Sequence, residues 1–220
     1  MALINKNIQY LFIIIFLSII FIFASNSIFY LKNIVDLRNS WQGLVLFSSG
    51  AFIGMLLLPI LTIKLIFKDK LENFGWKLPE NLKEAAFLIF ISIAILTPII
   101  YFFSGLKSFQ NYYLIKEISP VFLLLTFFLS LFYYIAEEFL FRGFLFFGLL
   151  HKIGYHSFWI TSLLFSFFHL TKPMPEILFA FLTSFLFCYL SLKTKSFIPA
   201  VIVHYFISLS LNILMFINQI

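Results

Sequence analysis

Two adjacent glutamates and an arginine lie inside a long apolar stretch, which reads Tyr134-Ile-Ala-Glu137-Glu138-Phe-Leu-Phe-Arg142-Gly143. A charge at the centre of a membrane helix costs about 2.5–3.5 kcal/mol on insertion scales, so such residues face the bundle interior and often mark a functional site. Glu138 and Arg142 are four residues apart and can pair on one helical face, whereas Glu137 is rotated about 100° away. The spacing predicts a structural ion pair beside a carboxylate that is free for chemistry. The alternative is a salt-bridge cluster of all three residues that only locks the helix.

The chain has four histidines, and two of them lie in apolar stretches. His169 ends one stretch and His204 lies within the last one. A single membrane histidine often does no more than hydrogen-bond a neighbouring helix. Two of them, together with buried acids, favour a shared site. His151 and His156 flank a short loop with Lys152, and we expect them at the membrane interface.

Carboxylate and imidazole groups together permit two chemistries. A glutamate in a low-dielectric site could act as general base on a water molecule, with histidine assisting. Alternatively, Glu and His side chains could bind zinc, which would activate that water. The helix signature His-Glu-x-x-His is absent, and Cys188 is the single cysteine. We therefore predict no cofactor, although zinc stays compatible with these side chains.

The order and spacing of these residues resemble a known family. The motifs are Glu137-Glu138-x-x-x-Arg142, then Phe165-x-x-x-His169, then His204 in a late stretch. They are similar to those of the CAAX prenyl protease and bacteriocin-processing (CPBP) family of intramembrane glutamic endopeptidases. The resemblance covers about residues 118–217, and the earlier stretches match only in being hydrophobic. It implies a peptidase that acts on a peptide or protein substrate at the membrane.

The resemblance also implies a role for each motif residue. Glu137 would activate the attacking water together with His169, and His204 would stabilise the oxyanion of the tetrahedral intermediate. Glu138 and Arg142 would order the site or meet the substrate.

The third motif departs from the family pattern. The family has Asn or Asp four residues after the histidine, where this chain has Ser208. A serine can donate a hydrogen bond but is shorter, and Asn212 lies one turn further along. The departure puts the second oxyanion donor in doubt.

The elements that must position these residues are membrane helices. The chain is 62% hydrophobic and 11% charged, with a mean hydropathy of +1.05, whereas soluble domains carry about 25% charged residues. The apolar stretches are 8–31, 41–67, 84–104, 118–150, 157–171, 174–192 and 197–217. All but the fifth approach or exceed the ~20 residues that cross a bilayer. We predict an all-α fold, a polytopic membrane bundle of about seven transmembrane helices, with six to eight as the range.

We expect one membrane-embedded domain. Residues 1–117 would form N-terminal transmembrane helices of unassigned role, and residues 118–217 the catalytic core. The first stretch is too long for the ~7–15-residue apolar part of a signal peptide. Ser119-Pro120 is a good helix start, and a helix of about 31 residues from there would reach about 46 Å. We therefore expect the fourth helix to tilt, to kink near Gly143 or to project from the membrane.

Basic residues set the expected orientation in the cell membrane. A cytoplasmic N-terminus would place nine on the inside and five on the outside, and the positive-inside rule favours this arrangement. The two sets are Lys6, Lys64, Lys68, Lys70, Lys77, Lys83, Lys152, Lys193 and Lys195 against Lys32, Arg38, Lys107, Lys116 and Lys172. With this orientation we expect Glu137, His169 and His204 within the membrane or its cytoplasmic half, around a cavity open to the cytoplasm. The net charge of +6 indicates contact with lipid headgroups and no nucleic-acid partner.

Two other functions stay open. Intramembrane Glu and His residues also form proton relays in transporters, but the small size and the lack of a visible repeat count against one. Members of the resembled family are also associated with bacteriocin self-protection, so a non-catalytic or immunity-type protein is the other alternative. The sequence predicts neither the identity of the substrate nor the oligomeric state.

Overall fold

The computed structural model describes residues 2–26, 41–113 and 120–218, and side chains within 9–25, 41–113 and 122–218. All regular elements in this part of the chain are helical, as predicted. The α-helices are α1 (Ala2–Asn26), α2 (Trp41–Ala51), α3 (Leu58–Leu61), α4 (Leu82–Ser104), α5 (Lys107–Tyr112), α6 (Pro120–Glu138), α7 (Gly148–Ile153), α8 (His156–Phe168), α9 (Met174–Thr194) and α10 (Ile198–Ile217). The π-helices are η3 (Phe52–Leu57), η4 (Thr62–Phe67) and η6 (Phe139–Phe147), and η5 (Leu71–Phe74) is a 3₁₀-helix.

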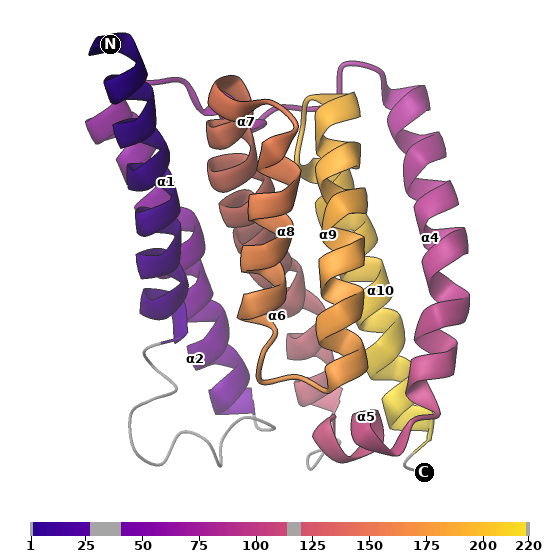
Figure 1. Cartoon of the computed structure of the whole chain (residues 1–220). Coiled ribbons are helices and arrows are strands. Elements are labelled where there is room, and N and C mark those ends of the chain that lie inside the picture. The colour runs from indigo at the N-terminus through magenta and orange to yellow at the C-terminus, as the bar shows by residue number, and fades with distance from the viewer. Residues whose placement is uncertain (1, 27–40, 114–119, 219–220) are drawn as a thin grey trace.

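The helices form an upright bundle with the two ends of the chain at opposite ends of it (Figure 1). Within the described residues, five helical rods are long and apolar enough to cross a membrane. They are Trp41–Phe67, Leu82–Ser104, Phe122–Ile153, Met174–Thr194 and Ile198–Ile217. Two shorter apolar helical segments, Gln9–Ser25 and His156–Phe168, run beside them. Within the described residues each of the seven predicted apolar stretches contains a helix, five of them long enough to span a membrane, and the predicted polytopic membrane bundle is confirmed.

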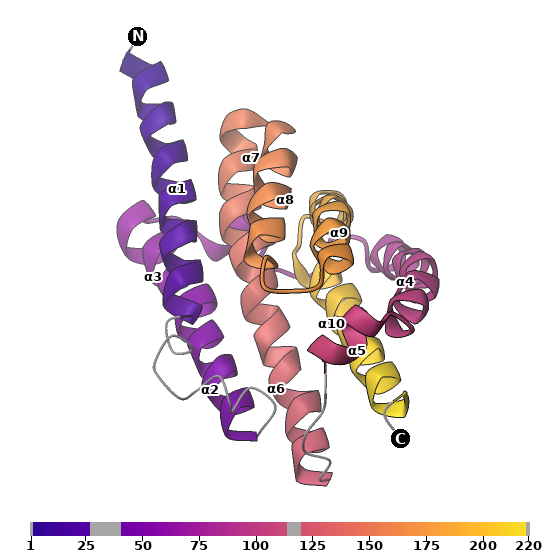
Figure 2. The same cartoon turned by 60° about the horizontal axis from the view of Figure 1, so that its bottom comes forward.

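The fourth predicted helix is a single rod in which α6, η6 and α7 follow one another without a break. It crosses the middle of the bundle, between α1 and α2 on one side and α9 and α10 on the other (Figure 2). The predicted start at Pro120 is confirmed, whereas Ser119 lies outside the described residues. The central part has π-helical hydrogen bonding, a geometry that is rare and often found at functional sites.

All nine residues of η6 are buried, and its packing explains the glycine in the Arg142-Gly143 pair. A Cβ atom at Gly143 would lie 2.6 Å from the Phe139 ring and 3.1 Å from the Phe74 carbonyl oxygen. The residue following Arg142 must therefore lack a side chain if the segment 68–81 is to pack against this helix. The rod is π-helical at this position, where the sequence suggested a kink as one of three alternatives.

The segment between η4 and α4 closes one end of the bundle. The Trp76 ring lies edge-on against Phe139, with 4.9 Å between ring centroids, and 5.5 Å from the Phe197 ring. Ser196 Oγ donates a hydrogen bond of 2.5 Å to the Lys77 carbonyl. These contacts tie the segment to the turn between α9 and α10.

Two ion pairs lie on the surface of this end, and the one between Lys195 and Glu80 also holds the segment 68–81 against the turn between α9 and α10. Lys195 Nζ lies 2.8 Å from the Glu80 carboxylate, and Lys77 Nζ lies 3.1 Å from it. Hydrogen bonds from Lys195 and Lys77 lower the pKa of this exposed carboxyl below its usual value. Both lysines therefore face a negative charge at neutral pH.

Candidate active site

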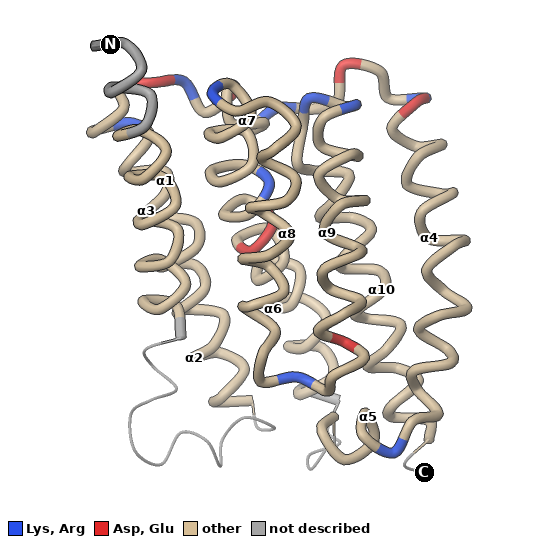
Figure 3. Tube along the Cα trace, viewed as in Figure 1, with Lys and Arg blue, Asp and Glu red and all other residues tan. Residues whose placement is uncertain are grey.

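The acid pair lies where α6 passes into η6, in the middle of the bundle. Glu137 is 1% exposed, and Glu138 and Arg142 are fully buried. Arg142 Nη1 donates a 3.1 Å hydrogen bond to Glu138 Oε1. The predicted pairing of these two residues is confirmed. Figure 3 shows this charge inside a bundle whose other described charges lie at its ends.

Aromatic rings surround the Arg142 guanidinium. Its Cζ atom lies 4.2 Å from the Phe165 ring centroid and 5.0 Å from that of Phe187. Cation–π attraction of this kind strengthens when the cation is desolvated. The pair is thus fixed by α8 and α9 as well as by its own helix.

His204 of α10 contacts Glu138, whereas Glu137 is the acid expected to do chemistry. Its Nδ1 atom lies 2.7 Å from Glu138 Oε1, the same oxygen that accepts from Arg142. A carboxylate cannot donate, so Nδ1 carries the hydrogen and the opposite ring atom, Nε2, stays available. Glu138 therefore orients His204, a contact that the sequence did not predict.

His169 follows the last residue of α8, and its ring is fixed by its own backbone. Nδ1 lies 2.8 Å from the Phe165 carbonyl oxygen. Because a carbonyl oxygen only accepts, Nδ1 is the protonated nitrogen and Nε2 is left with a lone pair. The histidine is held in the tautomer that can accept a proton from, or orient, a water molecule.

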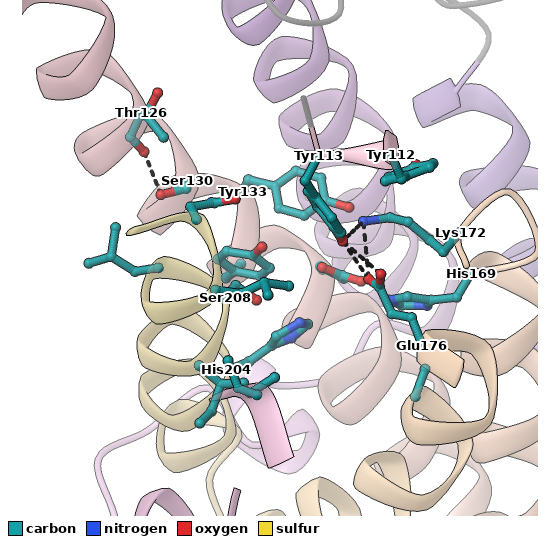
Figure 4. A pocket seen from close by; sticks show the side chains of 18 of the residues that line it. Tyr112, Tyr113, Thr126, Ser130, Tyr133, His169, Lys172, Glu176, His204 and Ser208 are labelled. Atoms are coloured by element: carbon teal, nitrogen blue, oxygen red, sulfur yellow. Dashed lines mark hydrogen bonds and ion pairs between the residues drawn. The ribbon is translucent and has the colours of Figure 1, made fainter. Parts of the chain in front are cut away.

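A cavity of about 840 Å³ brings the predicted residues together. Glu137, His169, His204 and Ser208 all line it, and so does Asn212. In Figure 4, His204 and Ser208 project from α10 on one side of the cavity and His169 lies on the other. Residues from α6, the end of α8 and α10 therefore share one hollow.

Other predicted residues lie away from this cavity. Glu138 and Arg142 are behind its wall and are not among its described lining residues. His151 and His156 are exposed at the opposite end of the bundle, which agrees with the interfacial position expected for them. Cys188 is buried and free. In the part of the chain that the structure describes, no three His, Cys, Asp or Glu residues are grouped so that they could hold a metal ion.

Two tyrosines that the sequence analysis did not single out complete the polar part of the wall. Tyr133 and Tyr134 line the cavity together with Glu137 and Ser208. The Tyr134 ring also packs on the His204 ring, with 4.4 Å between centroids. Tyr133 and Tyr134 precede the motif by four and three residues, respectively, but tyrosines are common in this chain and gave no separate signal.

A charged cluster that the sequence analysis also missed lies beside His169. Lys172 Nζ donates a 2.6 Å hydrogen bond to the Tyr113 hydroxyl and lies 3.2 Å from Glu176. The Tyr113 hydroxyl in turn lies 2.7 and 2.8 Å from the two Glu176 carboxylate oxygens. The cluster connects α5 to the turn that carries His169. The spacing of Lys172 and Glu176 is i,i+4, but the partner on α5 could not be found from sequence.

Tyr113 and Lys172, the two titratable groups of this cluster that lie outside the membrane spans, both have raised pKa values. Burial, followed by the charge of Glu176, raises the pKa of the Tyr113 phenol well above its usual value. Burial alone would lower the pKa of Lys172, but the Glu176 carboxylate and nearby tyrosines raise it above the usual 10.5. At neutral pH the cluster therefore holds a charged ammonium and a neutral phenol.

The position of the cavity corrects one expectation. We expected it to open to the cytoplasm with the N-terminus inside. Its wall includes Tyr112, Tyr113 and Lys172, which lie at the end of the bundle opposite the N-terminus (Figure 1). The reason is that α8 begins at the N-terminal end, so His169 is carried to the far end. A cytoplasmic N-terminus and a cytoplasmic cavity cannot both hold.

Comparison with known protein families gives one match. Residues 119–210 match the family described as type II CAAX prenyl endopeptidase Rce1-like. This segment, somewhat less than half of the chain, is thus similar to the CPBP, or CAAX protease, family. The predicted resemblance is thereby confirmed, and the family is one of membrane proteases. Comparisons with curated proteins and with solved structures gave no significant match.

Proposed function

We propose that the chain is an intramembrane endopeptidase of glutamic type. The observation that supports this most strongly is the shared cavity, because three separate parts of the chain bring Glu137, His169 and His204 to its wall. The match of residues 119–210 to a protease family supports peptide hydrolysis in general, and the arrangement of these side chains supports the specific mechanism.

In the proposed reaction, water attacks the carbonyl carbon of the scissile peptide bond. Glu137 takes a proton from this water, and His169 accepts a hydrogen bond through its free Nε2. A tetrahedral oxyanion forms. The proton then passes from Glu137 to the leaving nitrogen, the C–N bond breaks, and a carboxylate and an amine leave. No covalent acyl-enzyme is required.

His204 stabilises the oxyanion in this proposal. Glu138 accepts from its Nδ1 and so orients the ring, and the opposite nitrogen, Nε2, is the atom that would donate to the oxyanion when it carries a proton. Ser208, which lies one turn further along α10 and lines the same cavity, supplies a second donor. Glu138 and Arg142 are positioning residues, because they lie behind the wall.

The partners in this proposal are the lipid bilayer and a membrane-associated peptide or protein. The chain is a multi-pass protein of the cell membrane with a cytoplasmic N-terminus. The distribution of lysines supports this orientation, because basic residues are retained on the cytoplasmic side.

The test compares protein N-termini in membranes that contain the wild-type chain with those that contain Glu137→Gln or His169→Ala. We expect new N-termini with the wild-type chain and none above background with either variant. Glu72→Gln and His156→Ala, which change exposed residues of the same types, serve as matched controls and should retain the wild-type pattern. If Glu137→Gln produces the same termini at the wild-type rate, the proposed mechanism is wrong.

The same experiment separates the alternatives. A protein that protects by binding alone would yield no new termini with the wild-type chain. A transporter would yield none either, and would instead show substrate-dependent proton flux in proteoliposomes.

A further inference from the structure

The two ends of the bundle differ in basic residues. Among the residues whose side chains the structure describes, the end that carries the N-terminus has Lys64, Lys68, Lys70, Lys77, Lys83, Lys152, Lys193 and Lys195. The opposite end has Lys107 and Lys172. Lys32, Arg38 and Lys116, which the sequence analysis also assigns to the opposite side, lie outside the described residues, and with Lys6 included the count over the whole sequence is nine against five. Figure 3 shows this unequal distribution. Lysine and arginine in short loops set membrane orientation, and acidic residues contribute little to it. The lysine-rich end is therefore assigned to the cytoplasm.

The cavity reaches only one of these two ends. Its described wall extends from Glu137 in the middle of the bundle to Tyr112, Tyr113, Thr171 and Lys172. These last residues belong to α5 and to the turn between α8 and α9, at the lysine-poor end. None of the described lining residues comes from the lysine-rich end.

Protein packing blocks the route from the lysine-rich end. The segment 68–81 covers it, with Trp76 packed against Phe139 and Phe197, and the nine residues of η6, which follow Glu138 along the rod, are all buried. A peptide that approached from the cytoplasm would have to displace this aromatic packing before it reached the acid.

We propose that the cavity takes its substrate from the outer face of the cell membrane. The inference rests on the proposed peptidase function and narrows its substrate class to exported peptides or proteins that an apolar segment holds at the bilayer. The wall is lined mainly by aromatic and aliphatic side chains, which suit such an apolar segment. A lipid-modified protein that stays in the cytoplasm would approach the lysine-rich end, where the segment 68–81 covers the bundle, and would not reach the cavity.

The first test labels single cysteines in intact cells with a membrane-impermeant maleimide. Lys107→Cys reports on the cavity end, and Lys195→Cys on the lysine-rich end. Both positions are exposed, and each change removes one lysine, so the two variants are matched in charge. The native Cys188 is fully buried, and the wild-type chain measures its background. Ser108→Cys, also exposed, is a second reporter for the cavity end.

We expect Lys107→Cys and Ser108→Cys to be labelled in intact cells at least about fivefold above wild type. Lys195→Cys should reach that level only after the membrane is permeabilised. The reverse pattern, or equal labelling of both ends in intact cells, overturns the proposal. So does a failure of both cavity-end reporters to react in intact cells while they react after permeabilisation.

The second test sorts the N-termini that depend on Glu137 by the side of the membrane on which they arise. Exported segments should exceed cytoplasmic ones at least about fivefold, and a cytoplasmic excess contradicts the proposal. The labelling result does not depend on activity. If labelling agrees and no Glu137-dependent termini appear, the proposed peptidase function fails while the orientation stands. If termini appear but labelling is reversed, the peptidase function stands and the outward opening fails.

Discussion

The buried ion pair at the centre of the bundle gives a quantitative prediction. Arg142→Met would leave the Glu138 carboxylate fully buried with His204 as its remaining described partner. Removing one member of a buried pair costs about 3–5 kcal/mol, because an uncompensated charge stays in a low-dielectric interior. Since about 1.4 kcal/mol corresponds to tenfold, the equilibrium between folded and unfolded protein should shift roughly a hundredfold to a few thousandfold. The lost contacts of the guanidinium with Phe165 and Phe187 add to this cost.

The double variant separates charge from packing. Arg142→Met combined with Glu138→Gln removes both charges and leaves an amide oxygen that can still accept from His204. Replacing an entire buried pair with uncharged groups is often close to neutral. We therefore expect the double variant to be more stable than Arg142→Met alone, with an interaction energy of about 2–3 kcal/mol.

The assay is equilibrium unfolding of the purified chain in mixed detergent and SDS micelles, followed by tryptophan fluorescence. Lys107→Met, which removes an exposed cation at the end of the bundle, is the control and should change the free energy of unfolding by less than about 0.5 kcal/mol. A loss below about 1 kcal/mol for Arg142→Met would refute the reasoning. So would a double variant whose loss equals the sum of the two single losses.

Three further predictions follow from the packing and from the cavity. Gly143→Ala should lower the free energy of unfolding by about 1–3 kcal/mol in the same assay, because its Cβ would overlap Phe139; unchanged stability would contradict the described packing. Ser208→Ala should lower kcat about 10²-fold without a matching change in KM, as expected for loss of an oxyanion donor, and a loss in Asn212→Ala instead would assign that donor to Asn212. Lys172→Met should lower Tm by a constant amount from about pH 7 to 9, and the difference should shrink only as the pH rises through the raised pKa of Lys172, because a group with a raised folded-state pKa stabilises below it. A difference that shrinks already between pH 7 and 9 would show that this pKa is not raised.

Much of the fold followed from the sequence because membrane helices impose a strong constraint. Backbone polar groups in a bilayer must be satisfied within the helix, so an apolar stretch of sufficient length has one main solution. The predicted stretch 41–67 and the observed rod Trp41–Phe67 agree for this reason. The π-helical turn at Phe139–Phe147 could not be read in the same way, since it depends on the packing of the segment 68–81 against Gly143.

In the candidate site, contacts along one helix could be predicted from the sequence, whereas contacts between helices could not. Spacing along one helix gave the Glu138–Arg142 pair, because i,i+4 neighbours meet regardless of the rest of the fold. The contact between His204 and Glu138 joins residues 66 positions apart and depends on which helices are adjacent. The same limit applies to Tyr113, whose partners on the turn after α8 are distant in sequence. The expectation that the cavity opens on the same side as the N-terminus was wrong because helix direction was not followed through α8 to His169.

The residues of the cavity wall that carry the proposed reaction differ from those that determine which substrate fits. The family match spans residues 119–210 and contains Glu137 and both candidate histidines. Yet the wall also includes Phe47 of α2 and Phe103 of α4, which lie outside the match and in helices that resemble the family only in being hydrophobic. A side chain on the wall excludes volume from the substrate whether or not it reacts. Exchange of the N-terminal helices between two members of the family should therefore change which peptides are cleaved and leave the dependence on Glu137 intact. This division explains why the motif identifies a reaction and leaves the substrate to residues that no motif describes.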